Sequence, residues 1–79
     1  MPVILRAGPY KVYFYSHEPN EPPHVHVDRD DCSAKFWLRP IRLARSDGFR
    51  EVELNRIRRL LKPHERHLVR AWYRHSERR

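Results

Sequence analysis

A chain of 79 residues with seventeen Lys/Arg, ten Asp/Glu and a net charge of +7 is small and strongly basic. A domain of this size buries only about 60% of its unfolded-chain surface, so we expect one domain of modest stability. The single cysteine, Cys32, excludes an intramolecular disulfide, and this favours the cytoplasm over a secreted location. No apolar run approaches the roughly 20 residues of a membrane span, and the layout of a signal peptide is missing, so we expect no membrane association.

The N-terminal half has the two-residue alternation of β-strands. Residues 10–17, YKVYFYSH, are rich in aromatic and β-branched side chains and give the surest strand. Further strands are expected over residues 24–27 and 32–39, and residues 3–6 could form a short first strand. Gly8-Pro9, a proline-rich loop and the acidic DRDD turn separate these segments. The IRLA segment, 41–44, adds one short strand or an extended edge. The sequence therefore predicts an antiparallel sheet of three or four strands over about residues 3–45.

The apolar spacing then changes to that of an α-helix. Leu54, Ile57, Leu60 and Leu61 share one helical face, and a second apolar set follows over residues 68–72. Pro63 would remove a hydrogen bond from a continuing helix, so we expect a second helix to begin there, with one helix kinked at this point as the alternative. The prediction is a single α+β domain, residues 1–79, with two C-terminal helices over about residues 50–78.

The positive charge is concentrated in this helical half. Residues 1–38 have a net charge of −1, whereas residues 39–79 have a net charge of +8. The arginines expected on outer helix faces are Arg56, Arg59, Arg66, Arg70 and Arg74. Guanidinium groups pair bidentately with phosphates and with carboxylates, and a concentrated positive potential attracts polyanions. We therefore expect a binding surface for RNA, DNA or an acidic protein; an arginine-rich surface that serves only solubility is the alternative.

Two histidines alternate with two valines in the HVHV segment. On a strand, His24 and His26 would lie roughly 7 Å apart on one face, and we expect both to point outward, opposite the valines. In a first interpretation they bind zinc or another divalent metal, with His17 or Asp28 as a third ligand. This signal is weak because the usual Cys/His spacing is missing.

A second interpretation is metal-independent cleavage of RNA. One imidazole would act as base and the other as acid, while Lys35 stabilises the charged transition state. Antiparallel pairing of HVHV with AKFW would place Lys35 on the histidine face. In a third interpretation, the histidines only bond loop carbonyls or the carboxylates of Glu18, Glu21 or Asp28, and so hold the loop in place.

Aromatic residues also fall on the face opposite the predicted core. Tyr13, Tyr15 and Trp37 could form an exposed platform on which nucleic-acid bases stack. Alternatively, they pack under a helix or a partner.

Several motifs carry a family resemblance. MPVILR, FYSHEPNEPPHVHV, AKFWL followed by P-I-R-L-A, GF-x-x-x-EL-x-x-I and a late AWY resemble, in this order and spacing, the small bacterial family called domain of unknown function 4160. The resemblance implies a toxin-like component of a toxin–antitoxin pair, encoded next to a small acidic partner, without a settled activity. The family often has Ser or Thr as a helix N-cap after Gly-Phe, where this chain has Arg50, so we expect Ser46 or Asp47 to cap the helix instead.

Together these observations favour a toxin-like or regulatory module that binds nucleic acid through its basic helical face and is neutralised by a small acidic antitoxin-like protein. The candidate active cluster consists of His24, His26 and Lys35. One alternative is a non-catalytic protein-interaction subunit with a structural histidine strand. Another is a divalent-metal-binding domain, with zinc as the possible metal.

Overall fold

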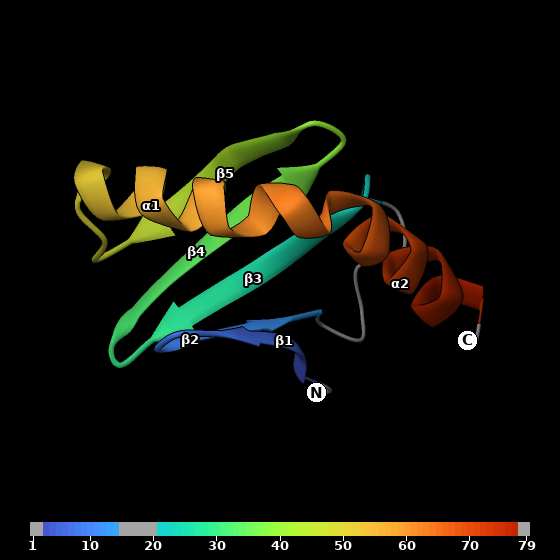
Figure 1. The fold of residues 1–79 in the computed structure, drawn as a ribbon, viewed down its shortest axis with the longest axis horizontal. Helices are drawn as coiled ribbons and strands as arrows, with labels where there is room; N and C mark the ends of the chain where they lie inside the picture. Colours follow the sequence, from blue (N-terminus) through green and yellow to red (C-terminus); the bar gives the residue numbers. More distant parts are fainter. Residues whose placement is uncertain (1–2, 15–20, 78–79) are drawn as a thin grey trace.

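The computed structural model describes residues 3–14 and 21–77, with side chains over 4–14 and 21–74. Within these ranges one antiparallel sheet has the strand order β1-β2-β3-β4-β5, so each strand pairs with the next along the chain (Figure 1). The strands are β1 (Val3–Ala7), β2 (Tyr10–Tyr13), β3 (His24–Arg29), β4 (Cys32–Leu38) and β5 (Ile41–Asp47). The α+β prediction is confirmed, but the described sheet has five strands where three or four were expected.

The fifth strand extends beyond the IRLA segment. β5 pairs with β4 from Leu38 opposite Ile41 to Ser33 opposite Asp47, with an irregularity between Lys35 and Phe36. Its last three residues are polar and exposed, so no apolar alternation marks them as a strand. They are held in the sheet by backbone pairing with β4, which hydrophobic patterning does not reveal.

Positive backbone φ angles mark the tight connections. Gly8 has φ 58° in the predicted Gly8-Pro9 turn, and Asp30 has φ 54° in the β3–β4 turn. Gly tolerates this region without a steric penalty, and Asp tolerates it better than most residues. Gly48, with φ 98°, connects β5 to the helical region and lies so close to β4 that a Cβ there would stand 3.0 Å from Cys32 Sγ.

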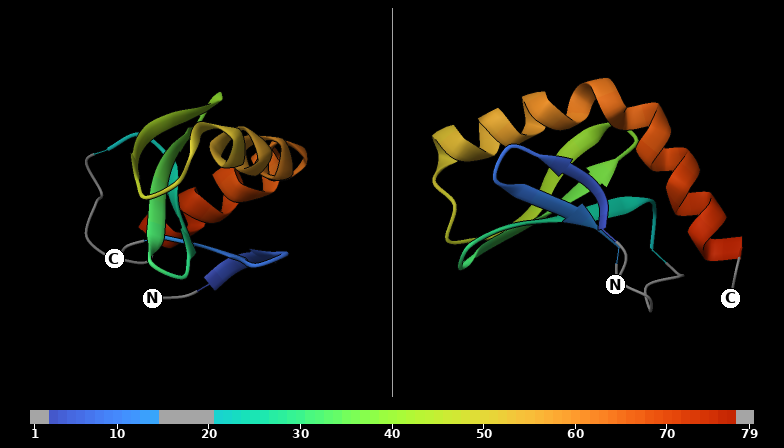
Figure 2. Two further views of the ribbon diagram at one scale, coloured as in Figure 1. Left: turned by 90° about the vertical axis from the view of Figure 1, so that its left-hand side faces the viewer. Right: turned by 60° about the horizontal axis from the view of Figure 1, so that its bottom comes forward.

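The helical region is one joined segment and not two separate helices. α1 (Glu51–Leu61) passes through a 3₁₀ turn, η1 (Lys62–His64), into α2 (Glu65–Glu77). Lys62 N–H still donates to Arg58 O, and Glu65 N–H donates to Lys62 O. Pro63 therefore tightens a single turn without ending the helix, because the hydrogen bonding continues in the 3₁₀ pattern around it. The bend at this turn is visible in Figure 2.

The start of α1 also differs from the prediction. Arg50 is the N-cap residue, in extended conformation and without a side-chain cap hydrogen bond, while its carbonyl accepts from Glu53 N–H and Leu54 N–H. Ser46 and Asp47 belong to β5, so the predicted caps are wrong. The acidic side chains of the first turn, Glu51 and Glu53, interact favourably with the positive end of the helix dipole and so stabilise a helix start that has no side-chain cap.

The helices cover one face of the sheet, and the hydrophobic core lies between them (Figure 2). Val25 and Val27 point into this core, as predicted, and both are fully buried. α1 contributes Leu54, Ile57 and Leu61. Leu60 was expected inward as well but is 37% exposed. The remaining buried core residues include Val12, Phe14, Ala34, Phe36, Leu38, Ile41, Phe49, Leu68 and Trp72.

A charged network attaches the start of α1 to the end of β3. Arg29 donates to both carboxylate oxygens of Glu53, at 2.6 and 2.9 Å, and the Tyr10 hydroxyl donates to Glu53 at 2.7 Å. The guanidinium of Arg29 also lies 5.6 Å from the centre of the Phe49 ring. The hydrogen bonds from Arg29 and Tyr10 lower the pKa of Glu53. This bidentate geometry fixes the position of α1 relative to the sheet.

Candidate functional site

The histidine strand is the first place to look for chemistry. His24 and His26 lie on the sheet face opposite Val25 and Val27, as the alternation predicts, but they are 0% and 5% exposed. The expectation that both imidazoles project into accessible space is therefore wrong. β3 lies between β2 and β4, and neighbouring aromatic side chains cover the rings on this face as well.

His24 is enclosed by the protein. Its Nδ1 lies 3.0 Å from the Pro22 carbonyl oxygen, so Nδ1 carries the proton and donates. The Glu21 carboxylate lies 3.7 Å from the same nitrogen. The ring centre is 4.6 Å from that of Trp72, in α2, and 5.7 Å from that of Trp37, in β4. These contacts match the structural interpretation, in which the imidazole bonds a loop carbonyl.

His26 is packed between two rings. The Tyr13 ring stacks on it with centres 5.5 Å apart and an interplanar angle of 24°, and the His24 ring meets it edge-on at 5.2 Å. The Tyr13 hydroxyl donates to Asp28 Oδ2 at 3.0 Å. Asp28 Oδ1 is buried and has no hydrogen-bond partner among the described residues. On this part of the sheet face, aromatic and polar side chains therefore pack mainly against one another.

Lys35 lies on the same face of the sheet as the histidines, as expected. The β3–β4 pairing puts it directly opposite His26. Its ammonium group pairs with the Glu21 carboxylate and lies 4.8 Å from the centre of the Trp37 ring, and the side chain is 12% exposed. The charge of Lys35 is thus engaged by its own neighbours, and a catalytic role for His24, His26 and Lys35 stays a prediction.

A small hollow of about 60 Å³ opens beside this row. It is lined by Tyr13, His26, Ser33, Ala34, Lys35, Arg45 and Ser46. This volume is far below the roughly 300–1,000 Å³ of small-molecule sites, so the hollow does not enclose a nucleotide. His24 does not line it, so the acid–base pair that RNA cleavage requires has only one member at the opening.

The other sequence-based sites on this face have little support. Tyr15, His17 and Glu18 lie outside the described residues. Within the described part of the chain, no group of three or more His, Cys, Asp or Glu side chains could hold a metal ion. Tyr13 is buried and Trp37 half-buried, so within the described residues these two do not form an exposed stacking platform. The metal-binding interpretation stays a prediction.

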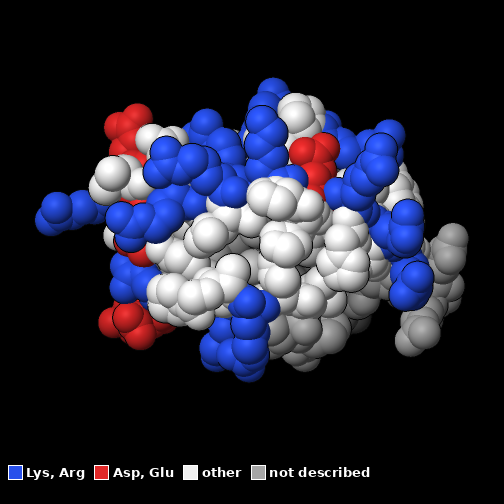
Figure 3. Space-filling view, viewed as in Figure 1, with Lys and Arg blue, Asp and Glu red and all other residues white. Residues whose placement is uncertain are grey.

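The exposed positive charge is concentrated elsewhere, over the helical segment and β5. Figure 3 shows Lys and Arg side chains gathered over α1, β5 and α2. A hollow of about 400 Å³ lies there, between the β4–β5 turn and the start of α2. We call it the arginine hollow; its lining residues are Arg39, Glu65, Arg66, Val69 and Arg70. It therefore combines two of the predicted binding arginines with one from the sheet.

Arg39 is oriented by a neighbour in α2. Its terminal nitrogen donates to the Tyr73 hydroxyl at 3.3 Å, which links the β4–β5 turn to the helix. A second hollow of about 120 Å³, lined by His67, Arg70, Ala71 and Arg74, lies on the other side of Arg70. The predicted stripe of Arg66, Arg70 and Arg74 is thus divided between two adjacent hollows that share Arg70.

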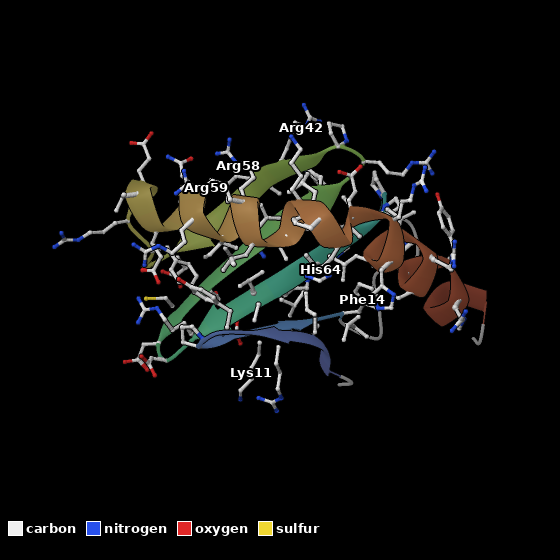
Figure 4. All side chains as sticks on the ribbon, in the orientation of Figure 1. Lys11, Phe14, Arg42, Arg58, Arg59 and His64 are labelled. Carbon is white, nitrogen blue, oxygen red and sulfur yellow. The ribbon has the colours of Figure 1, made fainter. Side chains whose placement is uncertain are left out.

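The arginines of α1 are distributed differently. Arg59 is exposed on the same side of the molecule as Arg42 and Arg58, while Lys11 projects from the opposite side (Figure 4). Arg58 donates to Asn55 at 2.9 Å. The positive charge of Arg56 contributes, after the hydrogen bonds from Arg29 and Tyr10, to lowering the pKa of Glu53. Arg56 therefore interacts with the Glu53 network and does not line the arginine hollow.

The contribution of the β4–β5 hairpin to this surface is not apparent from the sequence pattern. Arg39 and Arg42 flank the Pro40-Ile41 turn, and a hairpin turn carrying two arginines was the available signal. Only the three-dimensional packing shows that this turn lies beside the start of α2 (Figure 1).

The fold and these surfaces define a small α+β domain with a five-stranded meander in the described residues, a joined helical segment and a basic side. Residues 10–73 match the family described as "Domain of unknown function (DUF4160)", and the chain belongs to this family. Neither the curated proteins nor the solved structures include a significant match. Among the described residues, no helix is both long and apolar enough to cross a membrane.

Proposed function

We propose that this chain is a nucleic-acid-binding module whose contact surface is the basic side formed by the helical segment and the β4–β5 hairpin. The observation that carries the proposal is the convergence of Arg39, from the β4–β5 turn, with Arg66 and Arg70, from α2, around one accessible hollow. Guanidinium groups in such positions can each form paired hydrogen bonds with phosphate oxygens. The net charge of +7 adds long-range attraction toward a polyanion.

The distribution of apolar side chains favours nucleic acid over a protein partner. Protein interfaces have an apolar centre with few charges. The large apolar residues that are exposed in the described chain belong to three elements, namely Leu43 on β5, Val52 and Leu60 near opposite ends of α1, and Tyr73 on α2. Exposed arginines lie on the same three elements, including Arg42, Arg58, Arg59 and Arg70, and such concentrations of arginine are typical of surfaces that contact phosphates.

The role proposed here is binding without catalysis. Cleavage by two imidazoles needs both rings within reach of the substrate. His24 is fully buried and donates to the Pro22 carbonyl, so the histidine strand serves as a scaffold under this proposal. The histidines would then maintain the sheet face while the basic side binds the ligand.

The toxin–antitoxin association remains part of the proposal. A small acidic antitoxin-like protein, which the family resemblance implies, would be attracted to the same basic side as nucleic acid. The two ligands would then compete, and occupation by the acidic protein would release the nucleic acid. The chain would then be a regulatory or toxin-like module whose binding of nucleic acid is prevented when the acidic protein covers the basic side.

Fluorescence anisotropy with labelled single-stranded RNA, single-stranded DNA and duplex DNA tests the binding. We expect the logarithm of affinity to fall linearly with the logarithm of salt concentration, because each neutralised phosphate releases counterions. The double variant Arg66→Gln/Arg70→Gln should weaken binding about tenfold or more and reduce the salt slope.

The matched control is Lys11→Gln, which also removes positive charge but lies on β2, outside the proposed contact surface. It should bind within about twofold of the unmodified protein, since it is remote from the contact surface. Absence of binding to all three nucleic acids at low salt, or equal loss in the helix and control variants, would refute the proposal.

A further inference from the structure

We infer that the arginine hollow accepts a terminal phosphate group, so that the chain preferentially binds the phosphorylated end of a single nucleic-acid strand. This inference rests on the proposed function and specifies which part of the nucleic acid occupies the hollow. The ligand class is a phosphomonoester carried by a nucleotide.

The charge of the hollow supports a phosphomonoester. Its lining contains three guanidinium groups, those of Arg39, Arg66 and Arg70, and one carboxylate, that of Glu65, for a net charge of +2. An internal phosphodiester carries one negative charge, whereas a phosphomonoester carries about 1.5 to 2 at neutral pH. The terminal group also has three oxygens that can accept hydrogen bonds, where an internal phosphate has two that are not esterified. A terminal phosphate therefore matches the net charge of the hollow and offers one oxygen to each of the three guanidinium groups.

The shape of the hollow supports a strand end. At about 400 Å³ it falls within the range of small-ligand sites, so it can hold a nucleotide and not only a phosphate. Phosphates within a duplex lie on a convex backbone and reach a concave site less readily than a terminal nucleotide does. Val69 is half-buried in the wall and offers apolar contact to a sugar or base beside the charged groups.

The arginines that line the hollow come from two elements that are held together. Arg39 is in the β4–β5 turn, and its hydrogen bond to the Tyr73 hydroxyl connects that turn to α2. Arg66 and Arg70 are four residues apart on α2, so they lie one above the other on the same helical face. Side chains that are positioned before the ligand arrives lose less conformational freedom on binding, which favours recognition of a defined group.

The test compares the affinities of one short RNA sequence with a 5′-phosphate, a 3′-phosphate or hydroxyl groups at both ends. We expect one phosphorylated form to bind at least about tenfold more tightly than the hydroxyl form, as charge-assisted hydrogen bonds imply. A hydroxyl-ended RNA that is two nucleotides longer controls for the added charge. It should gain much less affinity than the phosphorylated strand.

Variants link the effect to the hollow. Arg39→Gln and Arg70→Gln should each bring the ratio of affinities for phosphorylated and hydroxyl ends close to one. Arg59→Gln removes a charge from α1, outside the hollow, and should weaken all strands alike while the ratio is kept. Because all three side chains are exposed, circular dichroism should show the same fold in each variant.

The outcomes separate this inference from the proposed function. Equal binding of phosphorylated and hydroxyl-ended RNA would overturn the inference and leave nucleic-acid binding intact. Failure of every RNA to bind would overturn both. Tighter binding of a phosphoserine peptide than of the phosphorylated RNA would overturn the inference as well, because the hollow would then recognise the phosphate on a protein.

Discussion

The two sides of this molecule use polar residues in opposite ways. On the sheet face, His24 donates to the Pro22 carbonyl, and Lys35 pairs with Glu21. On the helical side, Arg66 and Arg70 are exposed around an open hollow. The conspicuous His-x-His motif thus makes contacts within the fold, whereas a less distinctive set of arginines is accessible from outside. Solvent exposure therefore distinguishes the two groups of side chains more clearly than their residue types do.

Replacing His24 should give the largest effect on stability and is the sharpest challenge to this comparison. We expect His24→Ala to lower the free energy of unfolding by about 2–4 kcal/mol, because it creates a cavity against Trp72 and leaves the Pro22 carbonyl without its donor. Urea denaturation followed by tryptophan fluorescence measures the change. His67→Ala, on the exposed face of α2, is the control and should stay within about 0.5 kcal/mol of the unmodified protein.

The same variant also tests function. At temperatures where His24→Ala remains folded, its affinity for nucleic acid should equal that of the unmodified protein. A variant with unchanged stability but lost activity would show that the histidine acts on a ligand, and the contrast between the two sides would not hold.

A smaller effect is expected at the junction between the sheet and the helices. Gly48→Ala should lower the free energy of unfolding by about 1–3 kcal/mol, because its φ of 98° is strained for alanine and the new Cβ would lie 3.0 Å from Cys32 Sγ. Thermal denaturation measures the change in melting temperature, and Gly8→Ala is the comparison variant. Gly8 also has a positive φ but has nothing within 4 Å of the added Cβ, so its substitution should cost less.

The smallest expected effect is a pH dependence that arises from Glu53. Its pKa is lowered in the folded protein by hydrogen bonds from Arg29 and Tyr10, so its contribution to stability is complete above the ordinary carboxyl pKa of 4.5. The contribution is lost as the pH falls through the lowered folded-state value. Urea midpoints measured from pH 7 to pH 3 should therefore fall less steeply in Glu53→Gln than in the unmodified protein. Parallel curves for the two proteins would contradict this role of Glu53.

Local patterns predicted much of the sheet. The alternation around Val25 and Val27 correctly assigned the core face, and it also placed Lys35 on the histidine face of the sheet. Gly8-Pro9 was recognisable as a turn because glycine supplies the positive φ that the turn needs. These features depend on neighbours in sequence or on one strand pairing, which explains why they could be inferred.

Features that depend on packing between distant parts of the chain could not be predicted from the sequence. The burial of His24 depends on Trp72, which is distant along the chain, and no local pattern indicates that contact. The arginine hollow needs the turn at Arg39 to meet α2, which is likewise a consequence of the tertiary fold. Pro63 predicts a helix boundary, but the residues around it continue the hydrogen bonding in a 3₁₀ turn.

The outer edge of β5 has a consequence for how copies of the molecule meet. Strands at the border of a sheet expose backbone groups that can pair with a second chain and begin aggregation. β5 is terminal in the strand order and carries Arg42 and Arg45 in exposed positions. Two copies approaching along this border would bring four like charges together, so the arginines discourage fibre-like stacking while the strand itself stays exposed.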